Sequence, residues 1–326
     1  MMGKAKIGFC VTLVLTLLFS PGMDVARSQE KYPTRPIDII VPYAPGGGTD
    51  LAIRVVALYM NKKWGVPVNV INKPGGNTIP AGLEVFSAKP DGYTLLADGL
   101  PSASMLPVVV KNVPFKITDR SFLAMTTVVS SVMVIPPKHP VTNLKGLETL
   151  AKKEPENFTW ASMGGVGSAD LNARQFFMAI GLDFRKTRAV MCQGASQAVT
   201  LAAGGNVILG TVTTGTALPA IKGGLVKGLA IASQTRWPDL PDVPTTFEQG
   251  YPLINIEDWK CISGPPNVPS SVTEVWNAAL QEMVKDPEMI DKLKNIGARP
   301  NYHNSKETRE HVAREMEQIR KLYATD

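Results

Sequence analysis

A glycine-rich stretch near the N-terminus has the composition of an anion-binding turn. Residues 42–50 read Pro-Tyr-Ala-Pro-Gly-Gly-Gly-Thr-Asp, between an apolar run over 37–41 and apolar residues at helical spacing from Leu51. Glycines let a ligand approach the backbone closely. The first N–H groups of a helix have no partner within it and carry partial positive charge. A carboxylate or phosphate would therefore fit here, and an ordinary strand-to-helix connection is the alternative.

A second stretch repeats this arrangement. Residues 162–168 read Ser-Met-Gly-Gly-Val-Gly-Ser, after an apolar strand over 158–161 and before a helix with Ala173, Phe176 and Ile180 on one face. Ser168 could instead simply cap that helix. Two such loops, one in each predicted domain, suit a dicarboxylate, because each end of the ligand needs its own anion site.

The elements around these loops predict an α/β fold. Strands and helices alternate over residues 37–97, and a second alternating block begins near Ser131. Such alternation is typical of parallel sheets covered by helices, whose ligands usually bind where loops meet at the carboxyl ends of the strands. The loops expected there are 46–50, 72–77, 98–104, 162–168, 192–196 and 211–216.

The N-terminus predicts export. Residues 1–28 contain two lysines, an apolar run over 7–19 and Ala26-Arg27-Ser28, which together resemble a secretory signal peptide. The apolar run is too short to span a bilayer, so the mature chain is expected in the periplasm. The formal net charge of +6 lacks the Lys/Arg clusters that nucleic acid would require.

The sequence offers no catalytic, metal or cofactor site. The three histidines lie far apart without metal-ligand spacing, and neither a Gly-x-Ser-x-Gly elbow nor a Gly-Lys-Ser/Thr loop occurs. Two cysteines remain after residue 28, Cys192 and Cys261. Two separate buried thiols are expected, although a disulfide in an oxidising compartment is not excluded.

Several motifs resemble one family. In chain order they are Tyr-Pro-Thr-Arg-Pro-Ile (32–37), Pro-Gly-Gly-Gly-Thr-Asp (45–50) with Arg54, Asn-Lys-Pro-Gly-Gly (72–76), Pro-Asp-Gly-Tyr-Thr-Leu-Leu (90–96) and Leu-Pro-Asp-Val-Pro-Thr-Thr (240–246). Together they span essentially the whole mature chain. The chain resembles the Bug family, the periplasmic solute receptors of tripartite tricarboxylate transporters.

The resemblance implies a two-lobed periplasmic binding protein of the Venus-flytrap, type II-like class, with a mainly parallel sheet flanked by helices in each lobe. Lobe 1 would comprise residues 29–129 and 251–326, and lobe 2 residues 130–250. Such a receptor closes on a small organic carboxylate and delivers it to integral membrane permease subunits. We expect a monomer that performs no chemistry on its ligand.

The resemblance also implies ligand contacts, mainly through main-chain groups. Carried over by position, these are Gly47, Gly48 and Thr49 in the first loop and Ser162, Gly167 and Ser168 in the second. The other loops expected at the crevice add Ser102, Gly194 and Thr213. Tyr43 could flank the ligand or merely pack at the end of its strand. Asp50 could accept a hydrogen bond from a ligand hydroxyl or ammonium, or simply stabilise the first turn of its helix.

The chain departs from the family pattern in second-lobe loops, which would contact the end of the ligand away from the conserved carboxylate. Asp170 stands where the family commonly has histidine, and Cys192-Gln193-Gly194 stands where it usually reads Tyr-Lys-Gly. Gln193 would present a neutral amide in place of a charge. Aliphatic dicarboxylates and aromatic acids such as terephthalate or phthalate are both admissible ligands, and the missing Tyr-Lys pair favours the aromatic ones.

Two other functions remain open from the sequence. A ligand-sensing receptor without transport would share every feature above. An exported hydrolase would need a nucleophile with a positioned base, and no histidine accompanies a serine loop.

Overall fold

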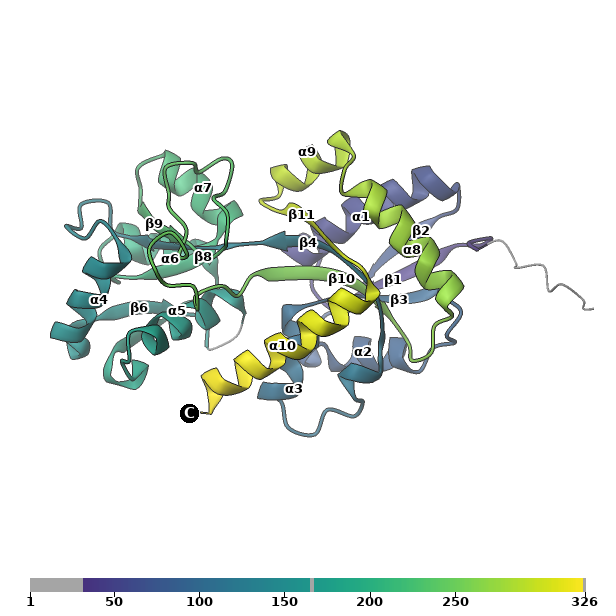
Figure 1. The fold of residues 1–326 in the computed structure, drawn as a ribbon, viewed down its shortest axis with the longest axis horizontal. Helices are drawn as coiled ribbons and strands as arrows, with labels where there is room; N and C mark the ends of the chain where they lie inside the picture. The colour runs from purple at the N-terminus through teal and green to yellow at the C-terminus, as the bar shows by residue number, and fades with distance from the viewer. Residues whose placement is uncertain (1–31, 165–166, 325–326) are drawn as a thin grey trace, which may run out of the picture. The chain divides into compact units, whose positions relative to one another are not determined.

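The computed structural model describes residues 32–164 and 167–324, and the predicted signal peptide lies outside them. Two sets of strands occur in this part of the chain, each flanked by helices (Figure 1). One set is a six-stranded sheet, and the other is a three-stranded sheet with a separate parallel pair. These sets form the two lobes of an α/β protein.

The first-lobe sheet has the order β11-β4-β10-β3-β1-β2. Its strands are β1 (Ile37–Val41), β2 (Val68–Asn72), β3 (Thr94–Gly99), β4 (Ser121–Val129), β10 (Asp258–Gly264) and β11 (Arg299–His303). β1 is parallel to β2 and β3, whereas β10 runs antiparallel to β3 and β4, and β11 antiparallel to β4.

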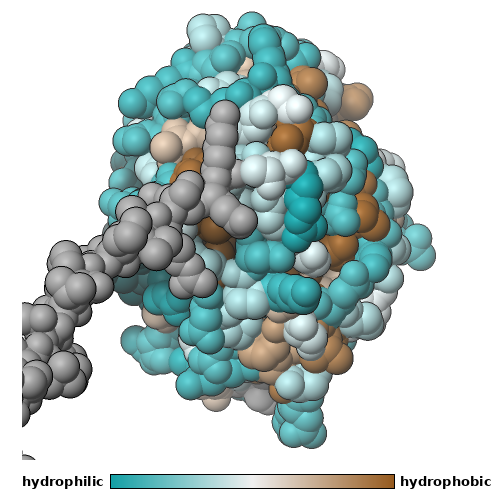
Figure 2. Space-filling view, turned by 90° about the vertical axis from the view of Figure 1, so that its right-hand side faces the viewer, coloured by the Kyte–Doolittle hydropathy of each residue, from teal (hydrophilic) through white to brown (hydrophobic). Residues whose placement is uncertain are grey.

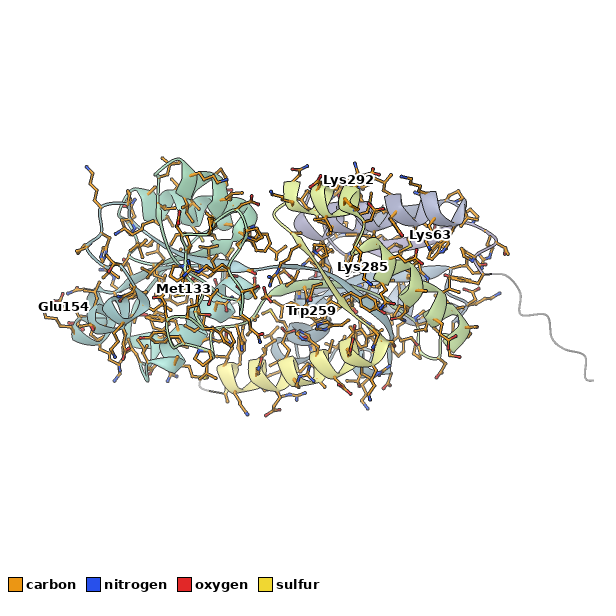
Figure 3. All side chains as sticks on the ribbon, turned by 45° about the horizontal axis from the view of Figure 1, so that its top comes forward. Lys63, Met133, Glu154, Trp259, Lys285 and Lys292 are labelled. Carbon is orange, nitrogen blue, oxygen red and sulfur yellow. The ribbon has the colours of Figure 1, made fainter. Side chains whose placement is uncertain are left out.

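Helices cover both faces of this sheet because its strands are apolar on both sides. On β1, Ile37 and Ile39 pack in a core with Trp276, while Ile40 points to the other face. Trp259 anchors the core beneath the last helix (Figure 3). The helical elements are α1 (Gly48–Trp64), η1 (Gly76–Thr78), α2 (Ile79–Phe86), η2 (Leu100–Met105), α3 (Leu106–Val109), η3 (Ile117–Asp119), α8 (Ser270–Met283), α9 (Pro287–Asn295) and α10 (Ser305–Tyr323).

The second lobe contains an antiparallel sheet of order β8-β5-β9 and the parallel pair β6-β7. Its core includes Met133 (Figure 3) and Trp160, which is buried as expected. Its elements are β5 (Ser131–Ile135), α4 (Leu144–Lys153), η4 (Pro155–Asn157), β6 (Thr159–Ser162), α5 (Ser168–Ala179), η5 (Phe184–Lys186), β7 (Arg188–Met191), α6 (Ala195–Ala203), β8 (Gly210–Thr213), α7 (Thr214–Lys222) and β9 (Lys227–Ile231).

The prediction of mainly parallel sheets is wrong in detail, because both lobes contain antiparallel pairs. Parallel neighbours need a crossover connection, which the β1–β3 segment has. β4 and β10 are instead separated by the entire second lobe, so no such crossover fixes their direction. The sequence analysis also missed β4, β10 and β11 as strands.

The chain passes between the lobes twice. It leaves the first sheet after Val129 and enters the second at Ser131, and it returns before β10. Ser130 Oγ donates to Glu257 Oε1 at 2.5 Å and so ties the two passages together. Tyr251 and Ile254 pack with the second-lobe core, and Ile256 packs with the first-lobe core. The returning chain therefore changes lobes gradually, and the predicted boundary at residues 250 and 251 stays a prediction.

Tyr251 is also part of a surface cluster. Glu148 on α4 accepts hydrogen bonds from the Tyr251 hydroxyl at 2.6 Å, Lys152 at 2.8 Å and Lys145 at 2.9 Å. The cluster fastens the returning chain to the outer helix of the second lobe.

The surface is mixed in character. Figure 2, which faces the end of the first lobe, shows mostly hydrophilic residues with hydrophobic ones interspersed. Glu154 and Lys292 lie at the edges of the molecule in Figure 3, and Lys63 and Lys285 are exposed. Within residues 32–164 and 167–324, no helix has both the length and the apolar character needed to cross a membrane.

Candidate functional site

The first glycine loop is exposed, and the carboxylate of Asp50 is hydrogen-bonded to its backbone. Gly46 has φ +81°, a conformation that favours glycine, and Gly47 is the N-cap of α1 without a side-chain hydrogen bond. Asp50 is 1% exposed and accepts from the Gly46 N–H at 2.8 Å, Asn72 Nδ2 at 2.9 Å and Arg54 Nε at 3.0 Å. Burial opposes ionisation of Asp50, but these donors outweigh it and lower the pKa of its carboxyl.

The second glycine loop has the same construction. Gly167 has φ +88° and is the N-cap of α5, again without a side-chain hydrogen bond. Asp170, at the third helical position like Asp50, accepts from Ser162 Oγ at 2.8 Å and the Met163 N–H at 2.9 Å. Ser162 Oγ in turn accepts from the Gly164 N–H at 3.2 Å. Ser168 is the first residue of α5 and does not cap it, so the alternative that Ser168 serves as the N-cap is wrong.

Two further helices of the second lobe begin beside this loop. Gly194 is the N-cap of α6 and Thr213 that of α7, and neither residue's side chain accepts a hydrogen bond from a backbone N–H of its helix. Strand pairing aligns Ser162 with Met191, which places residues 192–194 next to the glycine loop. Ser131 pairs with Thr213, and Ser131 Oγ donates to Ser168 Oγ at 3.2 Å.

The absence of caps distinguishes these helix ends. Among the described helices, α4, α9 and α10 are capped by Asn143, Asp286 and Asn304 side chains. α2, α3 and α8 begin with a proline at or beside the cap, which removes one N–H donor. The four helices at the predicted site, α1, α5, α6 and α7, have neither. Within the described ranges, no cap side chain therefore accepts from the first N–H groups of these four helices, although the Thr214 N–H donates to Ser130 O.

A cavity of about 410 Å³ adjoins the loops of the first lobe. The loops after β1, β2 and β3 all contribute to its wall, as the sequence predicts for one crevice. The Gly167 N–H lies 3.3 Å from Sδ of the lining residue Met105, although the cavity wall itself consists of first-lobe residues. The lining residues are Pro42, Tyr43, Gly75, Asn77, Thr78, Pro101, Met105, Leu106, Val109 and Val110.

Of the predicted ligand residues, Tyr43 forms part of the cavity wall, whereas Ser102 follows the lining residue Pro101 without lining the cavity itself. Tyr43 is half-buried, and burial raises the pKa of its hydroxyl. Ser102 is fully buried; its Oγ donates to Asp98 Oδ1 at 2.5 Å and accepts from the Gly99 N–H at 3.2 Å. Asp98 also binds the buried Arg120 at 2.6 Å. The Ser102 side chain therefore forms hydrogen bonds within its own loop, as the Asp50 and Asp170 side chains do.

The other predicted residues differ in exposure. Gly47 and Gly48 are exposed, and Thr49 is 7% exposed. Gln193 is exposed, and its N–H donates to Gln197 Oε1 at 2.7 Å. Thr213 Oγ1 lies 3.2 Å from Thr216 Oγ1. Direct contact of each with a ligand stays a prediction.

Sequence reasoning missed Met105 and Thr78. Met105 directly follows the loop 98–104, which the sequence predicts at the crevice, but a helical turn that includes Met105 was not predicted. Thr78 has φ +67°, a strained conformation for a β-branched residue, and its buried Oγ1 has no hydrogen-bond partner within the described ranges. No pattern in the sequence indicates either property.

The titratable groups do not form a reactive centre. Cys192 and Cys261 are free and buried, which confirms separate thiols, and burial raises the pKa of both. His303 at the end of β11 and His311 on α10 have ring centroids 5.9 Å apart. In the part of the chain that the structure describes, no group of three potential metal ligands occurs.

Comparison with known proteins gives one consistent result. The model of TctC, the tripartite tricarboxylate transporter family receptor, matches residues 52–324. A UPF0065 protein of Bordetella pertussis is 31% identical over 271 residues, which is 83% of this chain and 83% of the relative. The structure of the periplasmic binding protein BugD is 27% identical with a TM-score of 0.70, over 90% of this chain and 98% of that chain.

A further structure, R. palustris Rpa4515 with adipate, has the same fold, with a TM-score of 0.74 at 23% identity over 90% of this chain and 98% of that chain. The predicted fold class and family are thus confirmed, and the family is one of receptors rather than enzymes. The chain belongs to the TctC (Bug) family of periplasmic solute-binding receptors of tripartite tricarboxylate transporters.

Proposed function

We propose that this receptor binds a small organic carboxylate between its two glycine loops and delivers it to membrane permease subunits. The candidates are the aliphatic dicarboxylates and aromatic acids predicted from the sequence. The observation that supports this best is the set of four helices, α1, α5, α6 and α7, that begin at the site without capping side chains. Each offers N–H donors and partial positive charge to an anion.

Main-chain donors matter here because the cations near the loops are already paired. Each lies within 3.0 Å of a carboxylate, in the pairs Arg54–Asp50, Lys73–Glu84, Arg120–Asp98 and Lys260–Asp258. A bound carboxylate would thus be held mostly by amides and hydroxyls. Because the donors come from both lobes, a ligand that contacts both sets would favour a closed arrangement.

The test is a thermal-shift screen of organic acids on the purified chain. A ligand at one hundred times its Kd stabilises the native state by about 2.7 kcal/mol, which raises Tm by several degrees. Gly48→Trp should weaken binding by at least about 100-fold, since an indole would occupy the anion site. Gly48 suits this better than the buried Thr49, because a Cβ at Gly48 would meet nothing within 4 Å.

The matched control is Ala278→Trp, an exposed position on α8 remote from the loops. Both variants should melt close to the wild-type temperature without ligand, and only Gly48→Trp should lose the shift. Binding that survives Gly48→Trp would refute the proposed site, and a screen in which no acid raises Tm would refute the proposed ligand class.

A further inference from the structure

The cavity beside the loops carries no charged side chain. Of its ten lining residues, seven are proline, aliphatic, methionine or tyrosine, and the others are Gly75, Asn77 and Thr78. Its size, about 410 Å³, falls within the range usual for small-molecule sites. A ligand group that enters this space therefore meets mostly apolar surface.

Among the described residues, no cation forms part of the cavity wall either. Lys73 and Arg54, on the neighbouring loops, are paired with Glu84 and Asp50. Lys111 follows the lining residue Val110 but is exposed and not part of the wall. A second carboxylate placed in the cavity would lose its hydration without gaining an ionic partner, which is unfavourable.

The second-lobe loops expected at the site are also uncharged. The loops 192–196 and 211–216 contain no charged residue. Met191, 64% exposed at the end of β7, lies beside the glycine loop, where its Cε would be 3.6 Å from a Cβ added at Gly164. With Met105, it offers a flexible apolar surface that adapts to a ligand body.

Three side chains in the wall carry a neutral polar group, those of Tyr43, Asn77 and Thr78. Thr78 lines the cavity in a strained, left-handed backbone conformation, and its buried Oγ1 lacks a partner among the described residues. Buried hydroxyls normally form hydrogen bonds, and strained residues are concentrated at functional sites. A hydroxyl or carbonyl on the ligand body would supply the missing partner.

From these observations, and resting on the proposed function, we infer that the ligand is a monocarboxylate with an uncharged, ring-sized body. The carboxylate lies on the glycine loops, the body fills the cavity against Tyr43 and Met105, and an uncharged polar substituent bonds Thr78. This narrows the ligand class, since it disfavours dicarboxylates of any skeleton.

The test compares benzoate, 4-hydroxybenzoate, terephthalate, adipate and 4-hydroxybenzamide by calorimetric titration of the purified chain. The first three differ only in the group opposite the carboxylate. We expect benzoate and 4-hydroxybenzoate to bind, the latter more tightly, and terephthalate and adipate to bind at least roughly 30-fold more weakly. Replacing Thr78 by valine, which has the same shape, should bring 4-hydroxybenzoate to within about twofold of benzoate.

A charge-introducing variant tests the cavity directly. Val109→Lys places an ammonium at a 39% exposed position of the wall and should reverse the preference, so that terephthalate binds more tightly than benzoate. Leu225→Lys, at a 57% exposed position of the second lobe, is the matched control and should change neither affinity.

The outcomes separate the two proposals. If terephthalate or adipate binds wild type as tightly as benzoate, the inference is overturned while the proposed function stands. If no acid binds, or 4-hydroxybenzamide binds as well as 4-hydroxybenzoate, the proposed function fails as well. An unchanged preference in a folded Val109→Lys variant would show that the ligand body lies elsewhere, and an unchanged preference in Thr78→Val would overturn the role of Thr78.

Discussion

Replacing Asp50 by asparagine should lower both stability and ligand affinity. The carboxylate is buried and accepts hydrogen bonds from the Gly46 N–H, the Asn72 amide and Arg54. Asparagine is nearly isosteric but uncharged, and its NH2 group would face one of these donors. The substitution thus tests whether a single anion organises the glycine loop.

The expected magnitude follows from these contacts. Removing one partner of a buried ion pair costs about 3–5 kcal/mol, but Arg54 is 48% exposed, so solvent would compensate part of the loss. We expect a loss of about 2 kcal/mol, equivalent to a Tm decrease of roughly 4 °C for a chain of this size. Ligand affinity should fall by about tenfold, because binding would have to reorder at least one loop residue.

The assay is thermal unfolding with and without a bound acid. Asp38→Asn is the matched control, since Asp38 lies on β1, the strand before the glycine loop, and its carboxylate accepts a surface hydrogen bond from Asn69 Nδ2 at 2.8 Å; its Tm should stay within about 1 °C. A wild-type Tm in Asp50→Asn would refute the structural role of this carboxylate. A lower Tm with unchanged affinity would instead remove the first glycine loop from the binding site.

Three further predictions concern other parts of the chain. Two lysines and a tyrosine hydroxyl bonded to Glu148 lower the pKa of its carboxyl from 4.5 to about 2, so its stabilising effect is present above pH 4.5 and lost as the pH falls toward 2. The difference in Tm between wild type and Glu148→Gln should therefore vanish over that interval; parallel curves would contradict this. Gly215→Ala should weaken ligand binding severalfold in titrations, because a Cβ there would lie 3.3 Å from Gly297 Cα and press the two lobes apart; unchanged affinity would contradict it. Thiol labelling followed by mass spectrometry should modify Cys192, 8% exposed, faster than the fully buried Cys261, and equal rates would contradict the observed burial.

Much of the first lobe could be predicted because its signals are local. The apolar run of β1 and the glycines before α1 each follow from a few neighbouring residues. The missed strands lack such signals. β11 contains Pro300 and no apolar run, and it is a strand only because β4 offers it a free edge. Lys260, in the middle of β10, is buried, which no simple alternation predicts.

The ligand site divides in the same way. Glycine at 46 and 167 and an acid at the third position of each following helix are properties of short segments, so the sequence alone determined the two loops. Which neighbouring side chains remain available to a ligand depends on partners far along the chain. Ser102 is committed to Asp98, which also binds Arg120 and Ser263. Only tertiary packing brings those groups together, because hydrogen bonds and apolar burial act between atoms in contact, whatever their separation in sequence.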